Sequence, residues 1–178
     1  MDFNSQKVEQ VIERACAAID GDLILVGGAL VSVWLEPRRL TEDIDIFHRT
    51  DRAAAQIALW DIAADLGLPI EAINGAAEYF IRRIPNWDHG LVVLSQGDRG
   101  RVLRPSFTVF LLSKISRLSE RDLTDCRAAL AADLGQGADR EELDIPRVRA
   151  ALLELPEPEI DARLRLRRAT LASLLVER

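Results

Sequence analysis

The stretch LILVGGALVSVWLEPRRLTEDIDIF, from Leu23 to Phe47, constrains the fold of this chain more than any other. An apolar run of strand length ends at Gly27-Gly28, and a short apolar helical pattern follows before the segment EPRR. The pentapeptide DIDIF then alternates as a β-strand with one buried face does. The order of strand, glycine turn, short helix and strand predicts a mixed layer of α and β structure.

Asp43 and Asp45 are the unusual residues of this stretch, because a core strand has no need of two carboxylates. Successive side chains of a strand point to opposite faces, so the aspartates share one face while Ile44 and Ile46 face the core. Two carboxylates about 5 Å apart repel by roughly 3 kcal/mol at an effective dielectric constant near 20. A hard divalent cation such as Mg²⁺ removes this conflict and takes oxygen ligands. The pair is therefore a candidate metal site.

The glycine pair supplies a candidate phosphate site. Gly27 and Gly28 lie between a strand and the start of a helix, where the backbone can approach a phosphate and the first N–H groups of the helix can bind an anion. Each pattern alone is common in packing or at a solvated strand end. Together they are typical of a site for a metal-bound triphosphate.

Helical patterns surround this stretch. Apolar residues at helical spacing predict an amphipathic first helix that ends near Asp20-Gly21, and residues 52–66 predict another. In the segment 70–105 we predict a short helix from 71 to 84, then a strand from 91 to 95 and a hairpin turn into a further strand.

From Ser106 onward the pattern is helical, and Ser119 followed by Asp122 resembles a capping box. We therefore predict an α+β fold. A small mixed β-sheet core flanked by helices would occupy residues 1–105. An all-helical region at 106–178 would pack on it as a single compact unit.

Composition and charge exclude several classes of protein. Hydrophobic residues make up 48% and charged residues 29% of the chain, which is not the composition of a disordered protein. A net charge of −6 argues against nonspecific coating of nucleic acid. The longest mostly apolar run, Leu23 to Leu35, is too short to span a membrane, and the N-terminus lacks the apolar segment of a signal peptide. We expect a cytoplasmic protein without a membrane partner, in which Cys16 and Cys126 are buried thiols.

The glycine turn, short helix and Asp-x-Asp pattern resemble the signature of the DNA polymerase β-like nucleotidyltransferase superfamily. The form RRLTEDID, with Arg39 and Thr41 before the acidic pair, is similar to the AbiE-type (AbiEii) toxin branch. A second stretch, LLSKISRLSERDLTDC, resembles that branch's second signature, a helical lysine followed by Arg-Asp and a further Asp. These residues are Lys114, Arg121, Asp122 and Asp125.

The resemblance implies a nucleotide site. Asp43 and Asp45 would hold Mg²⁺ or Mn²⁺ against a nucleoside triphosphate (NTP), which Gly27 and Gly28 would contact through its phosphates. An acceptor hydroxyl would attack the α-phosphorus in line and release pyrophosphate. The further nucleotide-binding or catalytic candidates are Arg39, Thr41, Lys114, Asp122 and Asp125.

Lys114 is suited to the β- and γ-phosphates as a point charge. Its alternative interpretation is an ordinary lysine on the surface of an amphipathic helix.

The chain departs from the superfamily pattern in two places. Many members carry a third carboxylate on a later strand, but the predicted strand LVVLS has none. Asp88 and Asp98 flank that strand, and Asp122 or Asp125 could substitute. Gly28 stands where many relatives have serine.

The resemblance implies that a nucleoside monophosphate is transferred to the 3′ end of a tRNA, by the toxin of a toxin–antitoxin pair with a cognate antitoxin protein as partner. Two alternatives stay open. One is an enzyme of the same fold that modifies a protein or a small molecule such as an aminoglycoside. The other is a catalytically silent module that keeps the nucleotide pocket. Four arginines on the last helix favour a solvated face over a contact with RNA or with an acidic partner: Arg163, Arg165, Arg167 and Arg168.

Overall fold

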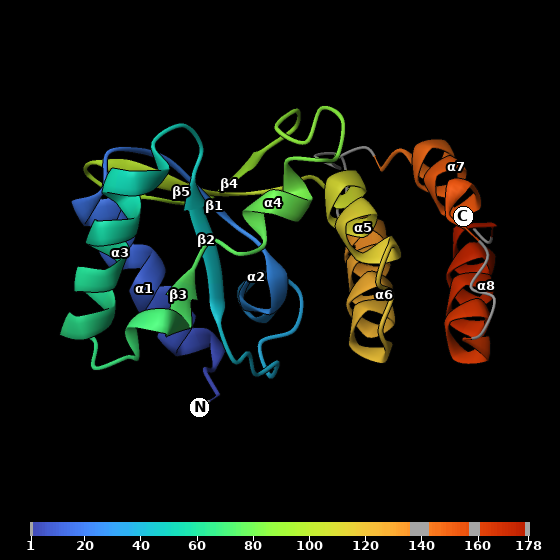
Figure 1. The fold of residues 1–178 in the computed structure, drawn as a ribbon, viewed down its shortest axis with the longest axis horizontal. Coiled ribbons are helices and arrows are strands. Elements are labelled where there is room, and N and C mark those ends of the chain that lie inside the picture. The colour runs from blue at the N-terminus through green and yellow to red at the C-terminus, as the bar shows by residue number, and fades with distance from the viewer. Residues whose placement is uncertain (1, 136–142, 157–160, 177–178) are drawn as a thin grey trace. The chain divides into compact units, whose positions relative to one another are not determined.

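The structure is a computed structural model that describes residues 2–135, 143–156 and 161–176. It divides into two compact units, Met1–Pro105 and Ser106–Arg178. The first unit contains a β-sheet with its helices, and the described part of the second is built from helices (Figure 1).

A five-stranded mixed sheet in the order β3-β2-β1-β5-β4 forms the centre of the first unit (Figure 1). The strands are β1 (Gly21–Leu25), β2 (Ile44–His48), β3 (Ile73–Asn74), β4 (Val92–Gln96) and β5 (Gly100–Arg104). β1 is antiparallel to β2 and parallel to β5. β3 is parallel to β2, and β4 is antiparallel to β5. The apolar strand before the glycine pair is thus the middle of the sheet.

The helices of the first unit begin where their sequences supply a cap. Asn4 caps α1 (Ser5–Ala18), because its side chain accepts a hydrogen bond from the backbone N–H of Lys7 at 3.0 Å. Asp51 caps α3 (Arg52–Asp65) in the same way. α2 (Gly27–Trp34) follows β1 directly and packs against α1 and β2. Figure 1 shows α1 and α3 on one side of the sheet and the short helix α4 (Glu78–Ile81) on the other.

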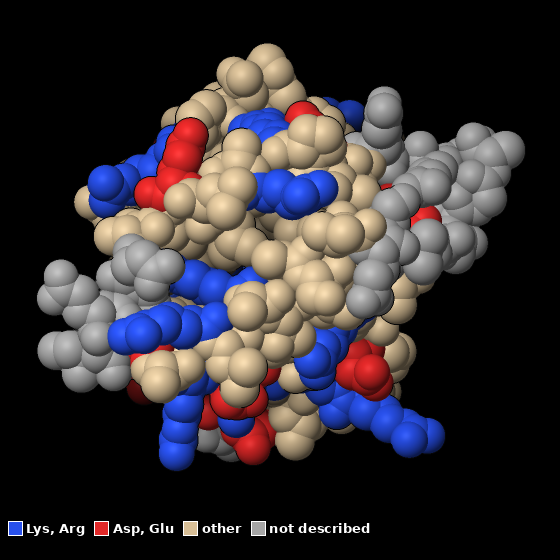
Figure 2. All heavy atoms as spheres, turned by 90° about the vertical axis from the view of Figure 1, so that its right-hand side faces the viewer, with Lys and Arg blue, Asp and Glu red and all other residues tan. Residues whose placement is uncertain are grey.

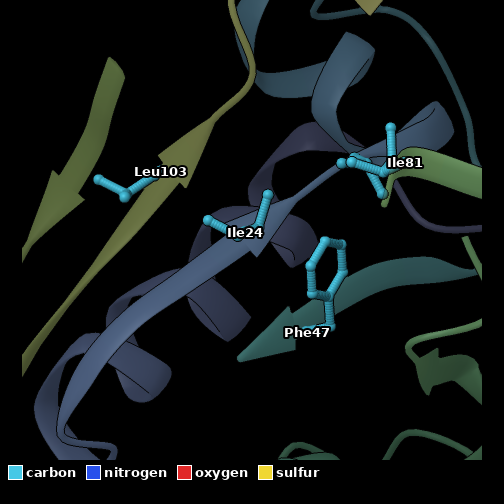
Figure 3. Packing of buried hydrophobic residues seen from close by; sticks show 5 residues of the cluster. Ile24, Phe47, Ile81 and Leu103 are labelled. Atoms are coloured by element: carbon cyan, nitrogen blue, oxygen red, sulfur yellow. The ribbon is translucent and has the colours of Figure 1, made fainter. Parts of the chain in front are cut away.

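Both faces of β2 carry buried side chains. Ile44 and Ile46 are completely buried on one face, as the alternation of the strand predicts. On the other face Phe47 is buried as well, in a small cluster with Ile24 of β1, Leu103 of β5 and Ile81 of α4 (Figure 3). The carboxylate-bearing face of the sheet therefore has its own core, and the acidic pair lies at the beginning of β2, beside that core.

The described part of the second unit contains α5 (Phe107–Ile115), α6 (Glu120–Gly135), α7 (Ile145–Glu154) and α8 (Ala162–Val176). Ser106 caps α5 through the N–H of Val109 at 3.2 Å, and Asp144 caps α7 through the N–H of Arg147 at 2.9 Å. α5 packs against α6 and α7, and α8 packs against α6 and α7.

The α+β fold class is confirmed, and so are the helices before Gly21, at 52–66 and after Ser106. The predicted helix at 71–84 is wrong in most of its length. This segment forms a 3₁₀ turn (Ile70–Ala72), the two-residue strand β3 and then the short α4. Asn74, Gly75 and Ala76 interrupt the helical pattern there, and the Asn74 side chain accepts the N–H of Ala76 at 2.9 Å.

Both cysteines are buried free thiols, as predicted, and burial raises the pKa of the Cys126 thiol to about 12. Within the described residues, no helix is both long enough and apolar enough to cross a membrane.

Candidate active site

Gly27 and Asp45 are in direct contact. Gly27 has a φ of +69°, and a β-carbon on it would lie 2.7 Å from Oδ2 of Asp45. The backbone holds the two segments together, because the N–H of Val26 donates to the carbonyl of Asp45 at 2.9 Å. A left-handed conformation and a carboxylate at this distance leave room for glycine alone. The structure thus brings the glycine turn and the acidic strand together as predicted.

Gly28 is in contact with the segment that precedes the acidic pair. A β-carbon on it would lie 2.7 Å from Oγ1 of Thr41 and 4.0 Å from Nη2 of Arg39. Thr41 is buried, and its hydroxyl donates to the carbonyl of Asp43 at 2.9 Å. Thr41 therefore positions the backbone of Asp43, and Arg39 places a guanidinium beside the glycine turn.

The start of α2 can receive an anion. Its first N–H groups have no partner within the helix, and the side chain of its N-cap residue, Val26, makes no capping hydrogen bond. Every residue of α2 is uncharged, so the positive end of the helix dipole is not offset by an acidic first turn. A phosphate at Gly27 and Gly28 would meet backbone donors there.

Asp43 and Asp45 differ in their surroundings. Asp43 is exposed, whereas Asp45 is half-buried and its Oδ1 accepts the backbone N–H of Ala77 at 3.3 Å. Two carboxylates at one strand end are the donor set that Mg²⁺ takes together with substrate phosphates. In the described residues no group of three or more His, Cys, Asp or Glu side chains is arranged to hold a metal. Among the described residues, Asp43 and Asp45 are therefore the ligands on which a metal site here would depend.

The strands that could carry a third carboxylate do not have one. β4 and β5, both fully described, contain neither Asp nor Glu. β5 is the strand beside β1, and it ends at Arg104, whose guanidinium lies 4.0 Å from the ring centroid of Trp34 in α2. This cation occupies the end of β5 nearest the glycine turn.

Asp88 and Asp98, which flank the predicted strand LVVLS and are candidates for the third carboxylate, do not lie at the glycine turn. Asp88 forms an ion pair with Arg49 at 3.0 Å, in a depression of about 630 Å³ beyond the His48 end of β2. Asp98 lies in the turn between β4 and β5. Because Gly100 pairs with Gly21, this turn is at the end of β1 opposite the glycine pair.

Lys114, Asp122 and Asp125 form a buried cluster in the second unit. Nζ of Lys114 lies 3.2 Å from Oδ1 of Asp122 and 3.0 Å from Oδ2 of Asp125. Asp122 also accepts from both the N–H and the hydroxyl of Ser119, and the Ser119 hydroxyl accepts the N–H of Asp122 at 3.2 Å. The predicted capping box is confirmed. Because Lys114 is 7% exposed, its interpretation as a surface lysine is wrong.

Several charges act on Asp122. Burial raises its pKa, but hydrogen bonds from Arg117, the charge of Lys114 and the bonds from Ser119 outweigh that effect. The net pKa of Asp122 lies well below the usual range of an aspartate. The carboxylate is therefore held ionised, and it keeps Lys114 fixed.

His48 and Arg167 of α8 have structural partners. Nε2 of His48 bonds to the carbonyl of Asp20 at 2.9 Å, and its Nδ1 accepts the N–H of Asp51 at 2.7 Å. On α8, Arg167 is half-buried and donates to the carbonyl of Leu118 at 2.5 Å. Arg163 and Arg165 are exposed. The face of the molecule drawn in Figure 2 shows scattered Lys and Arg side chains with Asp and Glu side chains among them.

Sequence reasoning missed Ala77 and Arg104. Ala77 acts through a backbone N–H, which leaves no mark in the residue pattern. Arg104 follows the predicted hairpin strand, and no local pattern indicates that this strand also pairs with β1 and so brings Arg104 beside the glycine turn.

Comparison with known families identifies the family of the chain. The model of the family described as "Nucleotidyltransferase of unknown function (DUF6036)" matches residues 5–158. The chain belongs to this family. The match covers the glycine turn, the acidic pair and the Lys114 cluster. No curated protein and no solved structure matches the chain significantly.

As a nucleotidyltransferase of the DUF6036 family, the chain is assigned to enzymes that take a nucleoside triphosphate as substrate. The general resemblance to nucleotidyltransferases is thereby confirmed. The contacts of Gly27 with Asp45 and of Gly28 with Thr41 are the local geometry in which such a site would be built.

Proposed function

We propose that the protein transfers a nucleoside monophosphate from an NTP to a hydroxyl of an RNA acceptor, with a divalent cation such as Mg²⁺ bound by Asp43 and Asp45. The contact of Gly27 with Oδ2 of Asp45 carries this proposal. It supports the proposal because the start of α2, where phosphates would bind, lies next to Asp45, so phosphates and cation would share one small region.

The residues of the chain would act mainly by positioning. The N–H groups at Gly27 and Gly28 bind phosphate oxygens, and Arg39 offsets negative charge beside them. The bound cation, when present, neutralises charge that develops on the phosphates. The acceptor oxygen bonds to the α-phosphorus, and the bond from that phosphorus to the β-phosphate oxygen breaks. Pyrophosphate leaves with the electron pair, and the hydroxyl proton passes to solvent.

A role of Lys114 at the β- and γ-phosphates stays a prediction, as do catalytic roles for Asp122 and Asp125. The Lys114 ammonium has three donors, of which Asp122 and Asp125 take two. Replacing Lys114 by methionine should weaken NTP binding if the ammonium contacts phosphate. If its role is packing alone, the same variant should unfold more easily while NTP affinity in the folded fraction stays unchanged.

The acceptor and the biological role come from the AbiEii resemblance of RRLTEDID and of the Lys114 stretch. On that basis we propose the 3′ end of a tRNA as acceptor and a toxin of a toxin–antitoxin pair as the role. Co-expression with the product of an adjacent gene should relieve growth inhibition if that role is right. Unimpeded growth on expression of the protein alone would contradict it.

A second candidate is a catalytically silent nucleotide-binding module. It is favoured by Arg104, which stands at the end of β5 nearest the glycine turn where an acidic residue would complete the metal ligands. Incubation with each α-³²P-labelled NTP, Mg²⁺ and total tRNA separates the two. Labelled tRNA supports transfer, whereas NTP binding without any labelled product supports the silent module. Label on protein or on an aminoglycoside added in parallel would instead identify another acceptor.

A further inference from the structure

Two exposed aromatic side chains stand next to each other on α4. Tyr79 and Phe80 are each 63% exposed, although large apolar side chains are normally withdrawn from solvent. Their ring centroids lie 5.4 Å apart, with the planes nearly perpendicular at 84°. They form an aromatic surface that the fold does not cover.

The position of this pair is fixed beside the acidic strand. Ala77, two residues before Tyr79, donates its N–H to Oδ1 of Asp45, so the Cα atoms of Ala77 and Tyr79 are at most about 7 Å apart. Ile81 is buried in the cluster with Phe47. α4 is thus anchored by its N-cap residue, Ala77, and by its last residue, Ile81, and Tyr79 and Phe80 between them are exposed.

Two arginines follow the rings, and one of them, Arg83, gives the surface a positive charge. Arg83 donates from Nη1 to the Tyr79 hydroxyl at 2.9 Å, and its guanidinium carbon lies 5.2 Å from the ring centroid. Arg82 is bound to Glu78 at 2.6 Å and lies over the rings of Phe47 and Trp87. The charge of Arg83 is therefore the one placed directly at the aromatic pair.

We propose that Tyr79 and Phe80, with Arg83, stack unpaired bases of a single-stranded RNA end and so present the acceptor to Asp43 and Asp45. The inference rests on the proposed function and names the part of the acceptor that the site recognises. Exposed aromatic side chains stack successive bases of a single strand, and a guanidinium beside them contacts the backbone phosphate.

The exposure of the rings favours a strand over a small molecule. A pocket for a small ligand encloses most of that ligand's surface, whereas these rings project from the protein. A polynucleotide can lie across such a surface, because neighbouring nucleotides share the binding. The RNA end, rather than the base of the incoming NTP, is therefore the occupant we assign.

The test uses a fluorescein-labelled RNA hairpin with a short single-stranded 3′ overhang, bound to the full-length protein and followed by fluorescence anisotropy. Tyr79→Ala and Phe80→Ala should each weaken binding by roughly 5- to 100-fold, from the usual contribution of one stacked base. Tyr79→Phe keeps the ring and should bind nearly as the unaltered protein does. Trp60→Ala removes an aromatic side chain that is 43% exposed on α3, and should leave binding unchanged.

A second RNA tests stacking itself. In this hairpin the overhang keeps its sugars and phosphates but lacks its bases, so Tyr79→Ala and Phe80→Ala should have no effect on its binding. Arg83→Ala should weaken both RNAs and reduce the dependence of affinity on salt concentration. Equal loss on the two RNAs for the ring variants would overturn the inference, as would absence of binding to the complete overhang.

Nucleotide binding is measured in parallel by isothermal titration calorimetry. Unchanged affinity of the ring variants for Mg²⁺ with a non-hydrolysable NTP supports the assignment to RNA. A loss there with RNA binding intact would assign the rings to the incoming base and overturn it. A lower melting temperature with RNA binding intact would assign them to packing. If the unaltered protein binds RNA through the rings but transfers no nucleotide, the proposed function fails while the RNA site stands.

Discussion

A β-carbon on Gly28 would lie 2.7 Å from Oγ1 of Thr41, so any larger residue at the second glycine position would clash with the side chain of Thr41. The clash involves the hydroxyl oxygen of Thr41, because the distance between the added β-carbon and the β-carbon of Thr41 would be 3.4 Å. It also gives a physical reason for the missing serine. With Thr41 in place, a hydroxyl at residue 28 has no room.

This relationship predicts coupling between the two residues. Ala is normally favoured over Gly in a helix, yet Gly28→Ala should lower the free energy of unfolding by about 1–3 kcal/mol because of the clash. Thr41→Ala should cost about 1 kcal/mol through its lost bond to the Asp43 carbonyl. The double variant should be more stable than the sum of the two losses by at least about 1 kcal/mol. Urea denaturation measures all four proteins, and strictly additive losses would contradict the contact.

Asp43→Asn and Asp45→Asn should each abolish most nucleotide transfer while the protein stays folded. An asparagine at residue 45 keeps an oxygen for the N–H of Ala77 but loses the charge that holds a cation. We expect a loss of about 100-fold or more, since a metal ion contributes several kcal/mol to such a step. Label transfer and circular dichroism are the two measurements. As a matched control, Asp61→Asn on α3 should retain full transfer.

Mg²⁺ and NTP should stabilise the protein jointly. The phosphates at the start of α2 and the carboxylates would share one ion, so the two ligands together should raise the melting temperature more than the sum of their separate effects. Differential scanning fluorimetry with Mg²⁺, with a non-hydrolysable NTP and with both gives the comparison. In Asp45→Asn the joint effect should vanish, and simple additivity in the unaltered protein would rule out a shared ion.

The Asp122 cluster should make the second unit sensitive to acid. The pKa of Asp122 is lowered in the folded protein, so its contribution to stability is complete above the ordinary aspartate pKa of about 3.9 and is lost as pH falls below it. Asp122→Asn should destabilise the protein at neutral pH by about 1–3 kcal/mol, because Lys114 loses one of its two buried carboxylate partners. It should also lose less stability than the unaltered protein between pH 5 and about pH 2.

Urea midpoints across that pH range test the prediction. Glu154→Gln removes an exposed carboxylate of α7 and serves as the control. If the two variants had the same stability at neutral pH, the cluster would contribute nothing to folding.

The sequence predicts elements that have a long periodic pattern. It also predicts contacts between residues that are close together in the chain. The alternation in DIDIF places Ile44 and Ile46 in the core and the aspartates on the other face. Ser119 and Asp122 form their capping box because both partners lie within one helical turn. The two-residue strand β3 could not be found in this way, since it is too short to show a period.

The sequence also does not predict which residues far apart in the chain come into contact. Arg104 reaches the glycine turn because β5 pairs with β1, and no local pattern announces that pairing. Tyr79 and Phe80 lie in a segment predicted as one helix, where two adjacent aromatic residues would normally put at least one ring in the core. Their exposure follows from the anchoring of Ala77 and Ile81, which involves β2.

The parallel pairing of β1 with β5 also affects how the chain folds while it is being synthesised. A chain synthesised through β3 already contains β1, β2 and β3, but one side of the apolar strand β1 still lacks its neighbour. Until β5 leaves the ribosome, that open edge can pair with another nascent chain instead. Closure of so long a loop is also slow compared with helix formation. Fragments that end before Gly100 should therefore aggregate, and chaperone dependence should be greatest while this edge is open.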